Sequence, residues 1–163
     1  MILLLLLFAL TLGAVSPSDG PEVKLQQGHC EMAWFKFNNR YYKYVARQMT
    51  YAKAELNCLS EGANLVSIHS LDEHDFVQTL IEKFDHANGR TWIGLSDLQE
   101  EGSWMWSDGC PARFFLWSRT EPNNSGGRED CVEKNRHPDK KWNDQPCSER
   151  IPSVCASRIM CPQ

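Results

Sequence analysis

The chain has 163 residues, which indicates one domain with enough length to bury a hydrophobic core. Charged residues make up 23% of it and aromatic residues 10%, and these values exclude the composition of a disordered chain. The net charge of -4 leaves no basic footprint, so we expect no nucleic-acid partner.

The first residues predict a secretory signal. Residues 1–15 are almost entirely apolar but are too few to span a membrane comfortably. Small residues occur at Ala14, Ser16 and Ser18, where a signal peptidase could cut, so we assign residues 1–16 to a signal peptide with the cut between residues 14 and 20. A type II membrane anchor is the alternative. Residues 17–28 are polar, with proline and glycine, and form a short leader; we expect a secreted, extracellular protein without a membrane span.

The first part of the domain predicts a hairpin and a helix. Aromatic residues lie on both sides of Asn38-Asn39, which indicates a β-hairpin within residues 34–45. Thr50 then begins a helix over residues 51–60, which ends at Gly62. Ala52, Leu56 and Leu59 have helical spacing and form its apolar stripe, and Cys58 on the same helix is expected to face inward.

A short strand and a second helix follow. Residues 64–68 are apolar enough for a strand. Ser70 and Glu73 have the spacing of a capping box, which predicts a helix that runs to about residue 84. Its apolar stripe consists of Phe76, Leu80 and Ile81.

From Thr91 onward, short apolar segments alternate with Gly, Pro, Asn and Asp. Short strands are expected at residues 92–95, 104–106, 114–117, 131–133 and 153–155. An early strand, two helices and then many short strands indicate an α+β fold. The connections between residues 99 and 142 are longer than compact domains usually allow, and such loops are mostly functional.

Oxygen-bearing side chains are concentrated in residues 121–144, with few apolar residues between them. A hydrophobic core has no use for such a run, whereas calcium takes six to eight oxygens from carboxylates, amides and water. We therefore interpret the segment as a calcium-binding loop. The candidate donors are Glu121, Asn123, Asn124, Glu129, Asp130, Asn143 and Asp144.

Seven cysteines predict disulfides in a secreted chain, and their odd number leaves at least one without an intrachain partner. None shows the paired CxxC spacing of a zinc ribbon, so structural zinc is not expected. The residues alone do not define the connectivity. The cysteines are Cys30, Cys58, Cys110, Cys131, Cys147, Cys155 and Cys161.

Four motifs, in order, carry a resemblance to a known family. They are Trp92-Ile-Gly-Leu, Glu121-Pro-Asn, Glu129-Asp-Cys and Trp142-Asn-Asp, and they interlock with the cysteines at 58, 131, 147 and 155. Together they resemble the C-type lectin-like domain, which we assign to residues 29–161. The resemblance implies two helices, two small antiparallel sheets and a long calcium-binding loop.

In the sugar-binding members of this family, one calcium ion is held by the residues that correspond to Glu121, Asn123, Glu129, Asn143 and Asp144. A cis peptide bond is expected before Pro122, because cis bonds are essentially confined to proline. Five protein groups do not fill the calcium shell, so two neighbouring sugar hydroxyls can complete it. The resemblance also implies that four side chains bond these hydroxyls directly, namely Glu121, Asn123, Glu129 and Asn143.

A second, auxiliary calcium site is implied in the same way. Some family members have Asp where this chain has Asn124, and the substitution lowers the charge of the ligand set. The alternative is a solvated acidic loop. The candidate ligands are Asp97, Glu101, Asn124, Glu129 and Asp130.

The family also implies disulfides Cys58–Cys155 and Cys131–Cys147. We pair Cys30 with Cys161, because the chain ends lie close together in this fold. Cys110 is then a candidate interchain link in a disulfide-linked homodimer. The alternative is that Cys30 is the interchain link.

Two further features lie in or near the loop. Asn123-Asn124-Ser125 is a glycosylation sequon, and a glycan on Asn123 would remove a calcium ligand, so we expect the sequon to be skipped. Residues 132–141 are basic and longer than is usual in the family. We favour a solvated loop here. The alternative is that the loop contacts an acidic sugar through His137, Lys140 and Lys141.

The predicted function is a secreted, calcium-dependent lectin without catalysis. In the family, the Glu-Pro-Asn order accompanies mannose-type sugars and Gln-Pro-Asp accompanies galactose, so we expect mannose-type glycans, as on microbial surfaces, and an agglutinating role in innate defence. The alternatives are a galactose- or lactose-binding lectin, a calcium-independent lectin, and an interaction or ice-binding protein on the same fold. Nucleophile motifs such as GxSxG are absent from the sequence.

Overall fold

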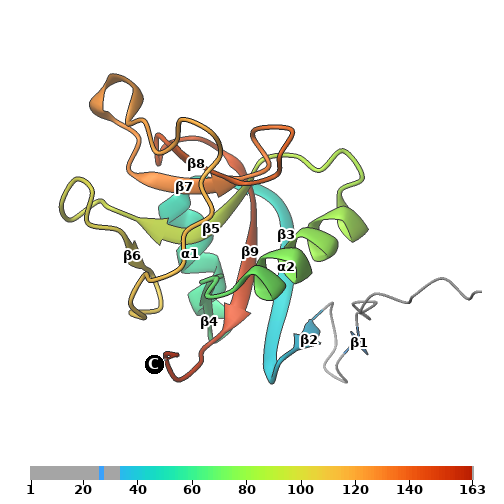
Figure 1. The fold of residues 1–163 in the computed structure, drawn as a ribbon. Helices are drawn as coiled ribbons and strands as arrows, with labels where there is room; N and C mark the ends of the chain where they lie inside the picture. The colour runs from blue at the N-terminus through green and yellow to red at the C-terminus, as the bar shows by residue number, and fades with distance from the viewer. Residues whose placement is uncertain (1–25, 28–33, 163) are drawn as a thin grey trace, which may run out of the picture.

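The computed structural model describes residues 26–27 and 34–162 (Figure 1). The predicted signal peptide lies outside these residues, as does most of the leader. Both predicted helices are confirmed. The elements are β1 (Gln26–Gln27), β2 (Phe35–Phe37), β3 (Arg40–Met49), α1 (Tyr51–Ser60), β4 (Ala63–Leu65), α2 (Leu71–Phe84), β5 (Thr91–Ser96), β6 (Met105–Trp106), the 3-10 helix η1 (Ser125–Gly127), β7 (Cys131–Lys134), β8 (Trp142–Gln145) and β9 (Ile151–Ser157).

The strands form one mixed sheet in the order β1-β2-β3-β9-β5-β7-β8, with β4 beside β9 and β6 beside β5. The α+β class is confirmed, and the two antiparallel parts that were expected are joined into this one sheet. Trp92 of β5 pairs in parallel with Ser153 of β9 and joins the two antiparallel parts. In a hairpin the turn sets the register of the two strands, but these two strands are not joined by a turn. No local sequence pattern therefore predicts their pairing.

Residues 114–117 do not form the strand predicted for them. Trp117 pairs with Trp142 only in an isolated bridge. The backbone N–H of Trp142 donates to the carbonyl of Leu116 (2.9 Å), and the N–H of Ser118 donates to the carbonyl of Trp142 (2.8 Å). The segment therefore runs beside β8 without continuing the ladder.

The expected inward orientation of Cys58 is confirmed, but the apolar stripe predicted for α1 is wrong. Tyr51, Ala54 and Cys58 are the buried residues, whereas Leu56 is 65% exposed and Leu59 39% exposed. A ten-residue helix offers two such stripes at i, i+3 and i+4 spacing, and periodicity alone does not choose between them. The disulfide between Cys58 and β9 selects the buried side.

The prediction for α2 is confirmed. Phe76, Leu80 and Ile81 are fully buried. The Ser70 hydroxyl accepts a hydrogen bond from the backbone N–H of Glu73 (3.2 Å), as the capping box requires. The Glu73 carboxylate accepts from the backbone N–H of His69 (2.8 Å), one residue before the expected donor.

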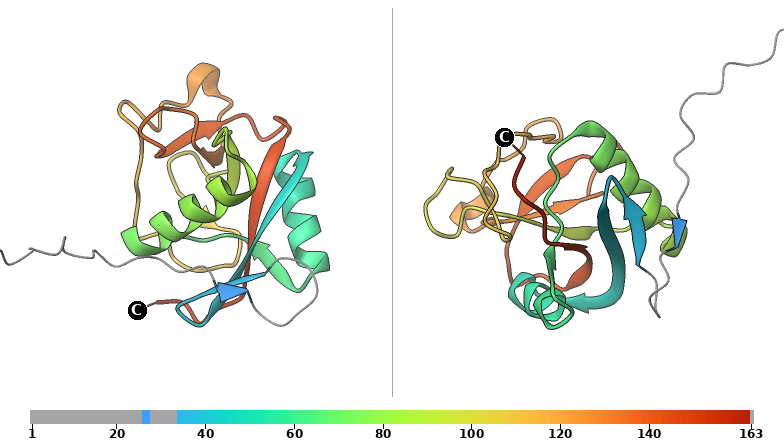
Figure 2. Two further views of the ribbon diagram at one scale, coloured as in Figure 1. Left: turned by 90° about the vertical axis from the view of Figure 1, so that its right-hand side faces the viewer. Right: turned by 90° about the horizontal axis from the view of Figure 1, so that it is seen from below.

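The two helices cover opposite faces of the sheet. Along β9, Val154 and Ala156 pack in the cluster that contains the apolar stripe of α2, whereas Cys155 packs with α1. Successive strand residues point to opposite faces, so β9 is buried on both sides. Figure 2 shows β9 and β3 between the helices.

Three disulfides occur among the described residues. Cys58–Cys155 and Cys131–Cys147 are confirmed. The predicted pairing of Cys161 with Cys30 is wrong, because Cys161 is bonded to Cys110, and so Cys110 is not an interchain link. The loop after β6 brings Cys110 to the C-terminal tail, a proximity that the sequence does not reveal. Cys30 lies outside the described residues.

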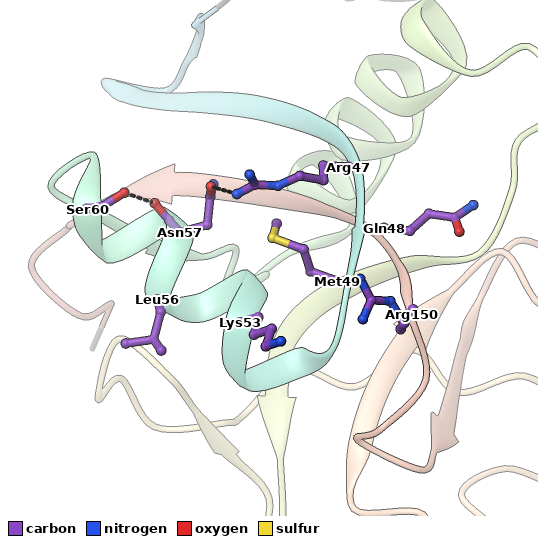
Figure 3. Close-up of a pocket in the computed structure, with 8 residues that line it drawn as sticks. All are labelled: Arg47, Gln48, Met49, Lys53, Leu56, Asn57, Ser60 and Arg150. Atoms are coloured by element: carbon purple, nitrogen blue, oxygen red, sulfur yellow. Dashed lines mark hydrogen bonds between the residues drawn. The ribbon is translucent and has the colours of Figure 1, made fainter.

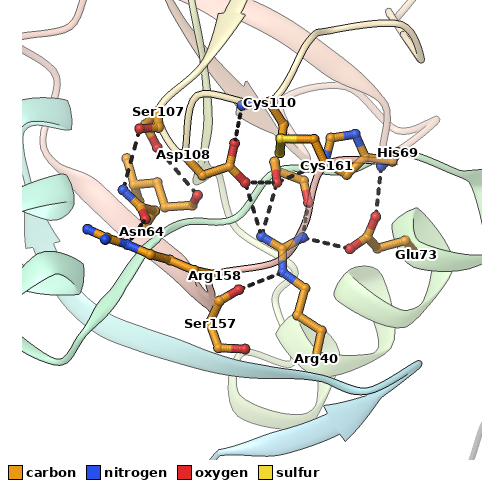
Figure 4. A network of polar contacts seen from close by, with 12 residues as sticks. Arg40, Asn64, His69, Glu73, Ser107, Asp108, Cys110, Ser157, Arg158 and Cys161 are labelled. Carbon is orange, nitrogen blue, oxygen red and sulfur yellow. Dashed lines mark hydrogen bonds and ion pairs between the residues drawn. A yellow bond between two sulfur atoms is a disulfide. The ribbon is translucent and has the colours of Figure 1, made fainter. Parts of the chain in front are cut away.

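A buried arginine ties several segments together near the C-terminal tail (Figure 4). The side chain of Arg40, at the start of β3, donates to Glu73 Oε1 (2.8 Å) and to the Ser67 carbonyl (2.7 Å). It also donates to the Ser157 carbonyl (2.9 Å) and lies 3.5 Å from Asp108 Oδ2. A buried charge persists only when it is paired and hydrogen-bonded, so the network fixes these segments relative to one another.

Part of the long connections lies at one end of the molecule. Figures 1 and 2 show η1, β7 and β8 at the end opposite to the C-terminus. The loop after β6 instead runs to the C-terminal tail, where Cys110 is bonded to Cys161. Among the described residues, no helix has both the length and the apolar character needed to cross a membrane. The sheet therefore serves as a platform for the loop that carries the oxygen donors.

We expect stability to rise with pH because of Lys134. This residue of β7 is fully buried and donates to Gln78 Oε1 (2.8 Å), and burial lowers its pKa to about 7. Between that value and the unfolded pKa of about 10.4, the unfolded chain binds more protons, so the free energy of unfolding increases with pH. Urea unfolding between pH 7 and pH 9.5 measures this rise. Lys134→Met should abolish it, whereas Lys36→Met, an exposed control, should keep it; an unchanged slope in Lys134→Met would contradict the assignment.

Candidate calcium site

Asp144 is the centre of the predicted primary site. Its carboxylate is buried and accepts hydrogen bonds from the backbone N–H groups of Asn123 (3.0 Å) and Asn124 (2.6 Å). The antiparallel pairing of β7 and β8 places Asp144 opposite Val132, directly after Cys131. Residues that are about twenty positions apart in sequence are thereby brought into contact.

Glu121 and Glu129 approach the same place from either side of η1. The Asn123 side-chain nitrogen donates to the Glu121 carboxylate. The Glu129 carboxylate accepts from the backbone N–H of Ser125 (2.7 Å), and its own N–H donates to Asn124 Oδ1 (3.1 Å). The peptide bond before Pro122 is cis, as expected.

The carboxylates of Glu121 and Asp144 lie against each other with little access to water. The Glu121 side chain is only 4% exposed and Asp144 is fully buried. Burial, followed by the contact with Asp144, raises the pKa of Glu121, while nearby His137 lowers it. Two acids in one buried position disfavour their joint ionisation unless a cation compensates. These carboxylate and amide oxygens are the donors that calcium prefers, so the residues fit the ion.

The side-chain nitrogen of Asn143 is engaged within the protein. Its Nδ2 donates to Glu133 Oε1 (3.1 Å) and to the carbonyl of Asp144 (2.6 Å). Both amide hydrogens are thereby used within the protein, which leaves Oδ1 as the group available to a metal. The predicted contact between the Asn143 nitrogen and a sugar hydroxyl requires one of these bonds to be exchanged.

Arg90, Glu133 and Gln145 support the site, and sequence reasoning missed them. Arg90 Nε donates to Glu133 Oε2 (2.6 Å), and its Nη2 donates to Gln145 Oε1 (2.8 Å). Gln145 Nε2 in turn donates to Glu129 Oε1 (3.1 Å). One signal was available: Asn143 and Gln145 are two apart in a strand and therefore share a face. The position of Arg90, more than forty residues earlier, had no such signal.

Residues predicted for the auxiliary site also lie close to one another. Burial, followed by the charges of Glu101 and Asp130, raises the pKa of Asp97, which is opposed by a hydrogen bond from the Gly102 N–H (2.8 Å). Asp97 Oδ1 is buried without a hydrogen-bond partner among the described residues. The Asn124 side-chain nitrogen donates to Glu101. An unpaired buried carboxylate oxygen beside two further acids suits a cation, so these residues fit calcium too.

The loop between β7 and β8 closes over one side of the primary site. His137 Nε2 lies 3.3 Å from Glu121 Oε1. Ser118 Oγ donates to Asp139 Oδ1 (2.8 Å), which fastens the loop to the segment before Glu121. Lys140 and Lys141 are half-buried in the same loop. Of the basic residues predicted here, His137 is the one that contacts a candidate ligand.

Comparisons with known proteins agree with this arrangement. A family model described as Lectin C-type domain matches residues 47–157. Lactose-binding lectin l-2 of Anguilla japonica is 44% identical over 147 residues, which cover 88% of this chain and 87% of that protein. Type-2 ice-structuring protein of Hemitripterus americanus is 37% identical over 137 residues, which cover 84% and 80%.

A solved structure gives the same result for the fold. The herring type II antifreeze protein superimposes with a TM-score of 0.73 at 34% identity, and the match covers 80% of this chain and 100% of that one. The family model and these relatives span most of the domain. The chain therefore belongs to the C-type lectin domain family and, like the lectins of that family, is not an enzyme.

Proposed function

We propose that this protein is a calcium-dependent carbohydrate-binding lectin. The proposal depends on the contact between the carboxylates of Glu121 and Asp144, which are almost inaccessible to water. Among the described residues, His137 is the basic side chain that pairs with this contact. A divalent cation stabilises such a pair. The primary ligands would be Glu121, Asn123, Glu129, Asn143 and Asp144.

When bound, calcium supplies a Lewis-acidic centre that accepts two neighbouring sugar hydroxyls. The protein residues around it orient the sugar. The Glu121 and Glu129 carboxylates accept from hydroxyl groups, and the Asn123 amide donates to them. The side chain of Asn123 is exposed, and its amide nitrogen donates to one residue of this cluster, Glu121. The side-chain amide can therefore turn toward a ligand at little cost.

For the sugar, we propose a mannose-type ligand on the basis of Glu121-Pro122-Asn123. The lactose-binding relative from Anguilla japonica favours a galactose-type ligand as the second candidate, because it is 44% identical to this chain. Either sugar requires an Asn123 without a glycan, so we also propose that the sequon at Asn123 is not glycosylated. It also includes calcium at the auxiliary site, held by Asp97, Glu101, Asn124, Glu129 and Asp130.

A glycan array probed with and without EDTA tests the proposal. We expect binding to mannose-terminated glycans, restored by millimolar calcium and lost with the chelator, because the hydroxyls bind through the ion. Lactose binding that EDTA abolishes would keep calcium dependence and replace the sugar. Glycan binding that persists in EDTA would contradict the mechanism. Mass spectrometry of the secreted protein checks that Asn123 carries no glycan.

We further propose secretion and an agglutinating role in innate defence. Single sugars bind such open sites weakly, so useful affinity requires several sites on one clustered glycan. Because Cys110 is bonded to Cys161, Cys30 is the cysteine that we propose as the link of a disulfide-bonded homodimer. A band of twice the monomer mass under non-reducing electrophoresis, lost on Cys30→Ser substitution, is the expected result.

Ice binding is the second candidate function. It is favoured by the 37% identity with the ice-structuring protein of Hemitripterus americanus and by the match to the herring antifreeze structure. Freezing-point hysteresis in the absence of any glycan binding would select this function over the lectin.

A further inference from the structure

A groove with a volume of about 490 Å³ lies between the end of β3, the outer side of α1 and the residue that precedes β9 (Figure 3). Arg47 and Met49 come from β3, and Lys53, Leu56 and Asn57 come from α1. Arg150 closes the groove next to the end of β3. None of the lining residues is a candidate calcium ligand, so the groove is separate from the site described above.

The groove concentrates positive charge on a chain whose net charge is -4. Arg47, Lys53 and Arg150 line it, and its described lining contains no carboxylate. Such a local cluster attracts anions whatever the net charge of the molecule. Arg47 Nη2 donates to Asn57 Oδ1 (2.8 Å), which holds the guanidinium in the groove and leaves its other N–H groups for a ligand.

Acidic residues near the groove are engaged elsewhere. Glu61 pairs with Lys43, and Glu149 lies 3.4 Å from Arg90. The Glu55 carboxylate accepts from the backbone N–H of Leu65 (2.7 Å), on the inner side of α1. The acids on and beside these elements therefore do not neutralise the groove.

The lining matches an acidic sugar better than a small ion. Guanidinium groups bind sulfate-like and carboxylate groups through paired N–H donors. The exposed Leu56 offers apolar surface to the C–H face of a sugar ring. The volume lies within the range of small-ligand sites. We propose that this groove binds the sulfate and carboxylate groups of an acidic polysaccharide, independently of calcium.

The test measures binding of the full-length secreted protein to immobilised heparin and hyaluronan in EDTA. The double variant Lys53→Gln/Arg150→Gln is compared with Lys36→Gln/Arg113→Gln, which removes the same charge from exposed positions on other elements. We expect heparin binding in EDTA that weakens with salt and falls about tenfold in the groove variant, with little change in the control variant. Calcium-dependent glycan binding should be the same in both variants, which separates this site from the proposed lectin site.

Several outcomes would overturn the proposal. One is the absence of heparin binding at low salt, and another is an equal loss in both variants, which would show a general charge effect. Heparin binding that disappears in EDTA would assign the polysaccharide to the calcium loop. Vesicles that contain phosphatidylserine serve as a further probe; groove-dependent binding to them without heparin binding would assign the groove to a membrane surface. Binding of heparin but not of hyaluronan supports the proposal and identifies sulfate as the recognised group.

Discussion

Replacing Asp144 with asparagine is expected to lower the affinity for calcium about 100-fold and to abolish sugar binding at millimolar calcium. Removing one partner of a buried pair of opposite charges costs about 2–5 kcal/mol. The pair here is the Asp144 carboxylate and the cation, and Asp144 lies at the centre of the primary ligand set. Asparagine keeps an oxygen that can accept from the backbone N–H of Asn123 or Asn124, so the loop retains part of its support. Isothermal titration with calcium measures the affinity directly.

The matched control is Glu100→Gln. Glu100 is an exposed acid near the auxiliary site, and its carboxylate accepts from Ser103 Oγ (2.9 Å) rather than from a ligand residue. It removes the same charge and should leave calcium affinity and sugar binding unchanged. Thermal unfolding of both variants in EDTA shows whether the fold is retained. An Asp144→Asn protein that is folded and still binds sugar with native affinity would refute the assignment of the primary site.

The largest loss of stability is expected when the Cys58–Cys155 disulfide is removed. Its cysteines are 97 positions apart and both are fully buried. Closing a loop of about one hundred residues removes about 4.7 kcal/mol of chain entropy from the unfolded state. Cys58→Ala/Cys155→Ala should therefore lower the free energy of unfolding by about 4 kcal/mol, or prevent folding at 37 °C. Urea denaturation checks this value.

The comparison is with Cys131→Ala/Cys147→Ala. These cysteines are 16 positions apart, so the expected loss is about 3 kcal/mol on the same relation. Cys131 begins β7 shortly after Glu129, and Cys147 follows β8, which contains Asp144, so removal of the bridge should weaken calcium binding as well. An equal or larger loss for the shorter loop would show that packing around Cys131, and not chain entropy, dominates.

Much of the fold follows from short-range patterns. The hairpin at Asn38-Asn39, the cap at Ser70 and the buried stripe of α2 were predicted because each depends on residues a few positions apart. The apolar stripe of α1 was predicted wrongly, since two stripes have the same helical spacing and the choice between them depends on packing against β9. The bond between Cys110 and Cys161 was not predicted, because contacts between distant segments leave no periodic signal in the sequence.

The candidate site divides in the same way. Its candidate ligands were predicted from their chemistry and from motifs such as Trp142-Asn-Asp, which the family resemblance arranges around an ion. The residues that hold those ligands in place were not found. Arg90 reaches both Glu133 and Gln145, and its role depends on the order of β5, β7 and β8 in the sheet.

The hydrogen bonds from the backbone N–H groups of Asn123 and Asn124 to Asp144 have a consequence for the thermodynamics of ligand binding. The lobe after the cis proline is already folded back onto β8 by these bonds and by the bridge from Cys131 to Cys147. An ion that enters does not have to spend its binding free energy on ordering a loose segment. Affinity then depends on ligand charge and on the energy of dehydrating the cation, as in a rigid chelator.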